Sequence, residues 1–139
     1  MDRKEFLTLI GFSTGGIILT SCLGACNQFQ ASPTVTPLVV DFTLNLSDPA
    51  NSVLKNIGGY LINNGVIVAH ATTGNYIAVA AACTHQGQNV QYITSSNSFY
   101  CFAHSSSFTN TGAVTGGPAS ANLQQMKTTL IGTSLRVQS

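Results

Sequence analysis

The chain of 139 residues is long enough for one domain with a modest core, and nine charged side chains give it a formal net charge of +1. Four of the nine lie in the first five positions, and the others are Asp41, Asp48, Lys55, Lys127 and Arg136. The sequence has no basic stripe of the kind that binds nucleic acid and no glycine-rich loop with a lysine that would bind phosphate. Composition therefore argues against nucleic-acid-binding and P-loop proteins.

The first 26 residues predict a signal peptide that is not part of the fold. A charged start is followed by an uncharged, partly apolar stretch over residues 6–25. The sequence Leu23-Gly24-Ala25-Cys26 resembles a bacterial lipobox, in which the cysteine is acylated and becomes the new amino terminus. Cys22 ends a poorer match, so we expect lipidation at Cys26. The alternative is an uncleaved anchor, because about 20 apolar residues can span a bilayer.

The expected route of export follows from Arg3 and Lys4, which resemble a twin-arginine signal with lysine in the second position. That route carries proteins that are already folded. Residues 27–37 are polar and contain Pro33 and Pro37, so they predict a short tether between the leader and a domain over residues 38–139.

The period of the apolar residues after the tether is two, which predicts strands. Alternation over residues 38–46 predicts a half-buried strand, and Asn63-Asn64-Gly65 predicts a hairpin turn between two short apolar runs. Further strands are expected over residues 76–80, 99–100, 126–131 and 135–137, with a turn at Gly132-Thr133. No long stretch has helical spacing, so the expected fold class is all-β.

Two loops hold the residues that carry chemistry. They read Cys83-Thr84-His85 and Cys101-Phe102-Ala103-His104, and each follows a predicted strand. Each loop therefore offers one thiol and one imidazole to a shared centre. Zinc also takes two cysteines and two histidines, but a zinc finger usually pairs like residues within one element. A disulfide between Cys83 and Cys101 is a further alternative in an exported protein.

This pattern resembles the Rieske iron-sulfur family. The resemblance implies one 2Fe-2S cluster, with Cys83 and Cys101 on one iron and His85 and His104 on the other. It also implies an antiparallel β-sandwich with a small cluster-binding subdomain formed by the two loops. Residues 116–119, Gly-Gly-Pro-Ala, resemble the third loop that covers the cluster in this family.

The resemblance also implies how the cluster is tuned. Ser106 matches the family serine that donates a hydrogen bond to a bridging sulfide, whereas Phe108 stands where a tyrosine is expected. High-potential members brace their loops with a disulfide, and the corresponding positions are Gln88 and Ala103. We therefore expect an intermediate reduction potential.

The sequence thus predicts an exported, membrane-tethered electron-transfer protein, periplasmic or on the outer surface, whose partner is a redox protein or a quinol or membrane oxidoreductase complex. We do not expect it to be an enzyme by itself, because an oxygenase needs a second iron site of two histidines and a carboxylate. After the four ligands only His70 remains, and we expect it to be a partly buried strand or turn residue. The alternative function is a zinc- or disulfide-stabilised interaction domain without redox activity.

Overall fold

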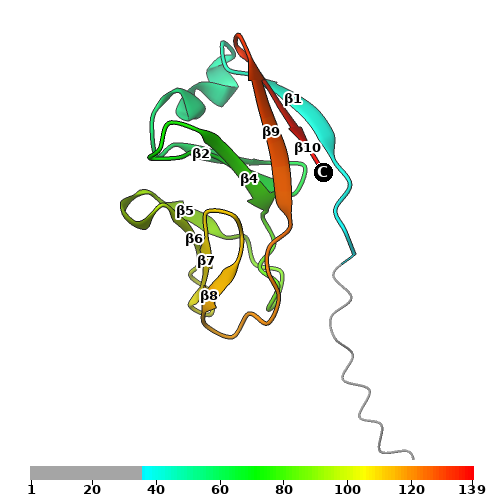
Figure 1. Cartoon of the computed structure of the whole chain (residues 1–139), viewed down its shortest axis with the longest axis vertical. Coiled ribbons are helices and arrows are strands. Elements are labelled where there is room, and N and C mark those ends of the chain that lie inside the picture. Colours follow the sequence, from blue (N-terminus) through cyan, green and yellow to red (C-terminus); the bar gives the residue numbers. More distant parts are fainter. Residues whose placement is uncertain (1–35) are drawn as a thin grey trace, which may run out of the picture. The chain divides into compact units, whose positions relative to one another are not determined.

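The computed structural model describes residues 36–139, which form two antiparallel sheets, one above the other in Figure 1. The six-stranded sheet has the order β1-β10-β9-β4-β3-β2, and the four-stranded sheet has the order β5-β6-β7-β8. The strands are β1 (Asp41–Asn45), β2 (Tyr60–Asn63), β3 (Val66–His70), β4 (Tyr76–Ala80), β5 (Gln91–Ile93), β6 (Ser98–Cys101), β7 (Ser106–Thr109), β8 (Val114–Gly116), β9 (Gln125–Ile131) and β10 (Ser134–Gln138). Two short 3-10 helices, η1 (Pro49–Lys55) and η2 (Thr94–Ser96), complete the elements. The expected all-β class is confirmed.

The hairpin between β2 and β3 forms at the predicted turn. Asn64 and Gly65 both have positive φ, at 49° and 75°, which is the backbone that a tight two-residue hairpin turn requires. Asparagine and glycine adopt this backbone at low cost, so the local sequence determines the turn. The register that follows pairs Asn63 with Val66.

β3 is buried on both faces, which explains its uninterrupted apolar run. Val66 and Val68 belong to one core cluster, with residues of η1, β1 and β10, whereas Ile67 and Ala69 belong to a second cluster. The second cluster includes Phe99, Phe108 and other residues of the four-stranded sheet. The two sheets therefore share a core in which β3 and β4 form the middle layer.

The predicted strand over residues 38–46 is shorter than expected, because β1 begins at Asp41. Leu38 is instead held by a side chain far away in the sequence. Its N–H donates to Oε1 of Gln124 at 2.7 Å, and Nε2 of Gln124 donates to its carbonyl oxygen at 3.0 Å. This contact fixes the beginning of the described chain beside the segment that leads into β9.

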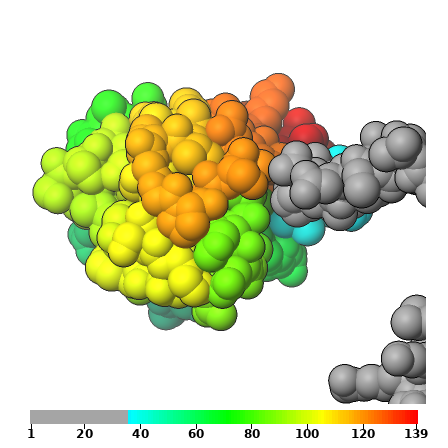
Figure 2. Space-filling model, turned by 90° about the horizontal axis from the view of Figure 1, so that it is seen from below, coloured from blue at the N-terminus to red at the C-terminus, as the bar shows by residue number. Residues whose placement is uncertain are grey.

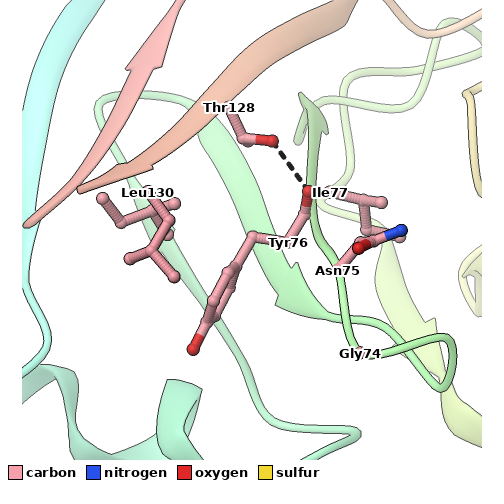
Figure 3. A pocket seen from close by; sticks show the side chains of 7 residues that line it. Gly74, Asn75, Tyr76, Ile77, Thr128 and Leu130 are labelled. Carbon is pink, nitrogen blue, oxygen red and sulfur yellow. Dashed lines mark hydrogen bonds between the residues drawn. The ribbon is translucent and has the colours of Figure 1, made fainter. Parts of the chain in front are cut away.

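The six-stranded sheet contains a cleft of about 460 Å³ where β4 and β9 separate. The two strands pair only at Ala78–Met126 and Val79–Gln125. Figure 3 shows Tyr76 and Thr128 among the residues that line the cleft, with the Thr128 side chain pointing at the backbone of Tyr76. Oγ1 of Thr128 donates to the Tyr76 carbonyl oxygen at 2.7 Å. None of the cysteines or histidines within residues 36–139 lines this cleft.

Candidate metal centre

Two loops carry the predicted ligands. In the sequence, the first loop precedes the hairpin of β5 and β6, and the second loop follows it. Cys83 follows β4 after a short connection, and Cys101 is the last residue of β6. Both cysteines are buried, at 2% and 0% exposure, and within residues 36–139 both are free thiols. They belong to the core cluster between the sheets. Because both thiols are free, the described structure does not contain the disulfide that was one alternative.

The first loop is held by its own backbone. The N–H of Cys83 donates to the carbonyl oxygen of Gln88 at 2.7 Å, and the N–H of Gly87 donates back to the Cys83 carbonyl oxygen at 2.8 Å. Gly87 has a φ of 74°, which the tight reversal of the chain requires. These bonds order the loop through the backbone of Gln88, at the position where the resemblance implies a bracing cysteine in high-potential members.

The two histidines lie together at the loop ends. Their imidazole centroids are 4.8 Å apart, and the rings meet edge to face at 76°. His104 is exposed and His85 is partly buried. The Nδ1 atom of His85 is buried and has no hydrogen-bond partner among the described residues. A buried imidazole nitrogen without a partner is costly in an apolar protein interior, and a metal ion bound there would satisfy it.

A buried imidazole nitrogen without a partner does not by itself identify a metal ligand, as His70 shows. Its Nδ1 atom is also buried without a partner in the described part of the chain. However, His70 ends β3 and stacks on Tyr76, with ring centroids 4.5 Å apart and an interplanar angle of 24°. The expectation of a partly buried strand residue is confirmed. His85 differs because a second imidazole lies beside it.

A third loop, over residues 116–119, packs against the second ligand loop. A Cβ atom on Gly117 would lie 2.4 Å from both the Ser105 carbonyl oxygen and the Ser106 Cα. Only glycine permits this approach, and its φ of 82° also favours glycine. In Figure 2 the green, yellow and orange segments that contain the three loops adjoin one another at one end of the domain.

Two hydrogen bonds join the third loop to the ligand loops. Oγ1 of Thr84 donates to the Ala121 carbonyl oxygen at 2.6 Å, and the N–H of Ala119 donates to Oγ of Ser106 at 3.2 Å. Ser106 is fully buried. Because its oxygen accepts the bond from Ala119, its own O–H remains available to donate. The Thr84 bond joins residues 37 positions apart, so no local pattern in the sequence indicates it.

The donor set fits an iron-sulfur centre of mixed ligation. A 2Fe-2S centre of mixed ligation takes two cysteines at one iron and two histidines at the other. Two buried free thiols and two adjacent imidazoles are side chains of the same types and numbers. Within residues 36–139 no three or more His, Cys, Asp or Glu side chains are grouped to hold a metal ion. A mixed 2Fe-2S centre asks for only two protein ligands at each iron.

Residues 47–127 match the Rieske [2Fe-2S] domain family. The cytochrome b6-f complex iron-sulfur subunit of Chlorobaculum thiosulfatiphilum is 24% identical over 139 residues, covering 96% of this chain and 74% of that protein. The subunit of the same name from Cyanothece sp. (strain PCC 7425 / ATCC 29141) is 44% identical over 141 residues, covering 88% and 76%.

The crystal structure of the cyanobacterial plasma membrane Rieske protein PetC3 from Synechocystis PCC 6803 is similar to this fold, with a TM-score of 0.54 and 30% identity. The match covers 63% of this chain and 93% of that structure. The family match spans more than half of the chain and contains both ligand loops. The chain therefore belongs to the Rieske 2Fe-2S domain family, whose cofactor is a 2Fe-2S cluster and whose chemistry is electron transfer.

Proposed function

We propose that Cys83 and Cys101 hold one iron of the 2Fe-2S cluster, that His85 and His104 hold the other, and that the chain carries single electrons between a membrane or periplasmic donor and an acceptor. The observation that carries this assignment is the convergence of both loops. Both thiols are buried and free, and the two imidazoles, one from each loop, have centroids 4.8 Å apart. His104 is the exposed member, so it is the proposed point of electron exchange.

These residues determine the electrostatics of the cofactor. A neutral imidazole brings less negative charge than a thiolate, so mixed ligation favours the reduced state and gives potentials of about −150 to +300 mV. The cysteines lie in an apolar core with Phe99 and Phe108, which excludes water from them. Of the two histidines, His104 is exposed to solvent and His85 is partly buried.

The electron paramagnetic resonance (EPR) spectrum tests the assignment. Full-length protein purified without air is measured before and after dithionite. A rhombic signal that appears only on reduction, with an average g value below that of all-thiolate 2Fe-2S proteins, is the expected result. A folded protein that shows no such signal and contains zinc or no metal would instead support the structural-domain alternative.

We propose an intermediate potential because one hydrogen-bond donor is missing. Hydrogen bonds to the cluster and its ligands raise the potential by stabilising the reduced state. Ser106 is buried with its O–H available, but Phe108 is fully buried and has no hydroxyl group. Phe108 shares the core cluster with both cysteines.

The Phe108→Tyr variant is expected to have a higher potential than the wild type, because it restores a hydroxyl at the position where the family carries a tyrosine. Redox titration followed by EPR measures the shift. The matched control is Phe99→Tyr, because Phe99 lies directly across from Phe108 and is equally buried. A Phe108→Tyr potential at or below that of the wild type, or an equal rise in the control, would contradict the argument.

We propose that the chain is exported and held at a membrane by a lipid on Cys26. The leader, lipobox and tether that suggest this lie in residues 1–37, of which residues 1–35 are outside the described structure. The described residues contain no helix long and apolar enough to cross a membrane. Relatives named as cytochrome b6-f complex subunits, and one named as a plasma membrane protein, favour a membrane oxidoreductase complex as the partner.

The Cys26→Ser variant is expected to lose fatty-acid labelling and to move from the membrane fraction to the soluble fraction, because the acylated side chain is gone. Cys22→Ser is the matched control and should remain in the membrane. Fractionation with immunoblotting measures both. Retention of the Cys26→Ser variant in the membrane would instead support an uncleaved anchor.

A further inference from the structure

The part of the domain that carries the ligand loops contains no charged side chain. Between Lys55 and Lys127 the sequence has no Asp, Glu, Lys or Arg, and this span includes all of the four-stranded sheet and the three loops. Two of the five charges in the described part of the chain neutralise each other. Arg136 binds both carboxylate oxygens of Asp41, at 2.9 and 2.6 Å, and this hydrogen bonding lowers the pKa of Asp41. A partner that binds at the loops therefore meets no charge that would steer it.

One large apolar side chain is exposed in these loops. Phe102 is 61% exposed, and it lies between the proposed ligands Cys101 and His104. Among residues 36–139 the other exposed large hydrophobic residues lie outside the three loops; they are Val39, Val53, Ile57, Ile62, Leu130 and Ile131. A single exposed apolar side chain is ordinary, but this one is two residues from the proposed point of electron exchange.

Phe102 is also held in place by its neighbour. Its ring meets the ring of Tyr100 edge to face, with centroids 4.8 Å apart and an interplanar angle of 75°. Tyr100 is half-buried on β6, where Phe99 and Cys101 on either side of it point into the core. An aromatic side chain that is already ordered loses little conformational entropy on binding. Rigid aromatic groups of this kind are typical anchors of protein interfaces.

We infer that Phe102, braced by Tyr100, is the docking anchor of this protein, and that it inserts into an uncharged apolar recess on a membrane-bound redox partner. The inference rests on the proposed function, because it takes His104 as the point of electron exchange. The missing charge around the loops identifies the chemistry of the partner's surface. A charged surface on the partner would lose its hydration on binding, and this protein offers no opposite charge at the loops to compensate for that loss.

Electron transfer to native membranes tests this inference. Full-length reduced protein is added to membranes from a strain of the source organism that lacks it, and the reoxidation rate is measured from about 10 mM to about 500 mM salt. The wild-type rate is expected to change by less than about twofold over this range. Phe102→Ala is expected to lower the rate about tenfold or more, since truncating an interface anchor costs over about 1.4 kcal/mol.

Two controls make the result specific. Ile131→Ala removes a side chain that is 75% exposed on β9 of the other sheet, so its rate should match the wild type. Phe102→Leu retains an apolar side chain and should restore part of the rate. The EPR signal and potential of Phe102→Ala should be those of the wild type, which separates docking from loss of the cluster.

Three results would overturn the inference. They are an unchanged rate in Phe102→Ala, a steep fall of the wild-type rate with salt, and no transfer from wild-type protein whose EPR signal is intact. Absence of the reduced-state signal in the wild type would instead contradict the proposed function itself. The two failures are therefore distinguishable in one preparation.

Discussion

Replacing His104 with alanine is expected to abolish the reduced-state EPR signal and the visible absorbance of the cluster. His104 and His85 form the imidazole pair, with centroids 4.8 Å apart, and each comes from a different loop. With one imidazole removed, the second iron would keep a single protein ligand, and water would reach it because His104 is on the surface. The bound iron, measured by elemental analysis, should therefore fall to near background.

The matched control for this variant is His70→Ala. His70 is a histidine of the same chain that stacks on Tyr76 at the end of β3. Its loss should cost stability of about 0.5–1.5 kcal/mol, the usual worth of an aromatic pair, and leave the EPR signal intact. Retention of the signal in His104→Ala, or equal loss in both variants, would show that the proposed ligand assignment is wrong.

The Gly117→Ala variant is expected to destabilise the site without removing a ligand. The added Cβ atom would lie 2.4 Å from two backbone positions, the Ser105 carbonyl oxygen and the Ser106 Cα. Because backbone atoms cannot swing away as a flexible side chain does, the third loop must move off the second. The Ala119–Ser106 hydrogen bond, 3.2 Å long, would then lengthen or break.

Gly74→Ala separates this clash from the cost of the backbone conformation. Gly74 has nearly the same φ, 85° against 82°, but no atom lies within 4 Å of its added Cβ. Gly117→Ala should therefore lose about 1–3 kcal/mol more than Gly74→Ala, the usual cost of overpacking. For a domain of this size each kcal/mol lowers the melting temperature by about 4–8 °C. Equal melting temperatures, with equally stable clusters, would show that the third loop does not brace the site.

Much of the framework follows from local sequence. The Asn64-Gly65 turn, β4 and the β9–β10 hairpin form where alternation and turn residues predicted them. Three strands of the smaller sheet were not foreseen. β7 contains three hydroxyl residues around one phenylalanine, and β5 and β8 have only three residues each, so their pattern resembles that of loops. They are strands because β6 pairs with β5 and β7, and β7 in turn pairs with β8, which is a tertiary effect.

The helix η1 was missed although it has a local signal. Asp48 accepts a hydrogen bond from the N–H of Ala50, and Pro49 occupies the first turn, as helix starts favour. The segment is too short for a helical period to appear in its apolar residues. Its one buried residue, Leu54, packs in a core cluster with residues of the six-stranded sheet. That burial, rather than propensity, stabilises the element.

The sequence by itself determined the chemistry of this protein, because the identity of a ligand depends only on the residue type and a short spacing within one loop. Cys83 with His85, and Cys101 with His104, were therefore readable as two donor pairs. Only the tertiary structure decided that the pairs converge, that the thiols are buried while His104 is exposed, and that Gly117 allows a third loop to cover the second. These properties depend on contacts between segments far apart in the chain, and a linear pattern contains no information on such distances until packing brings the segments together.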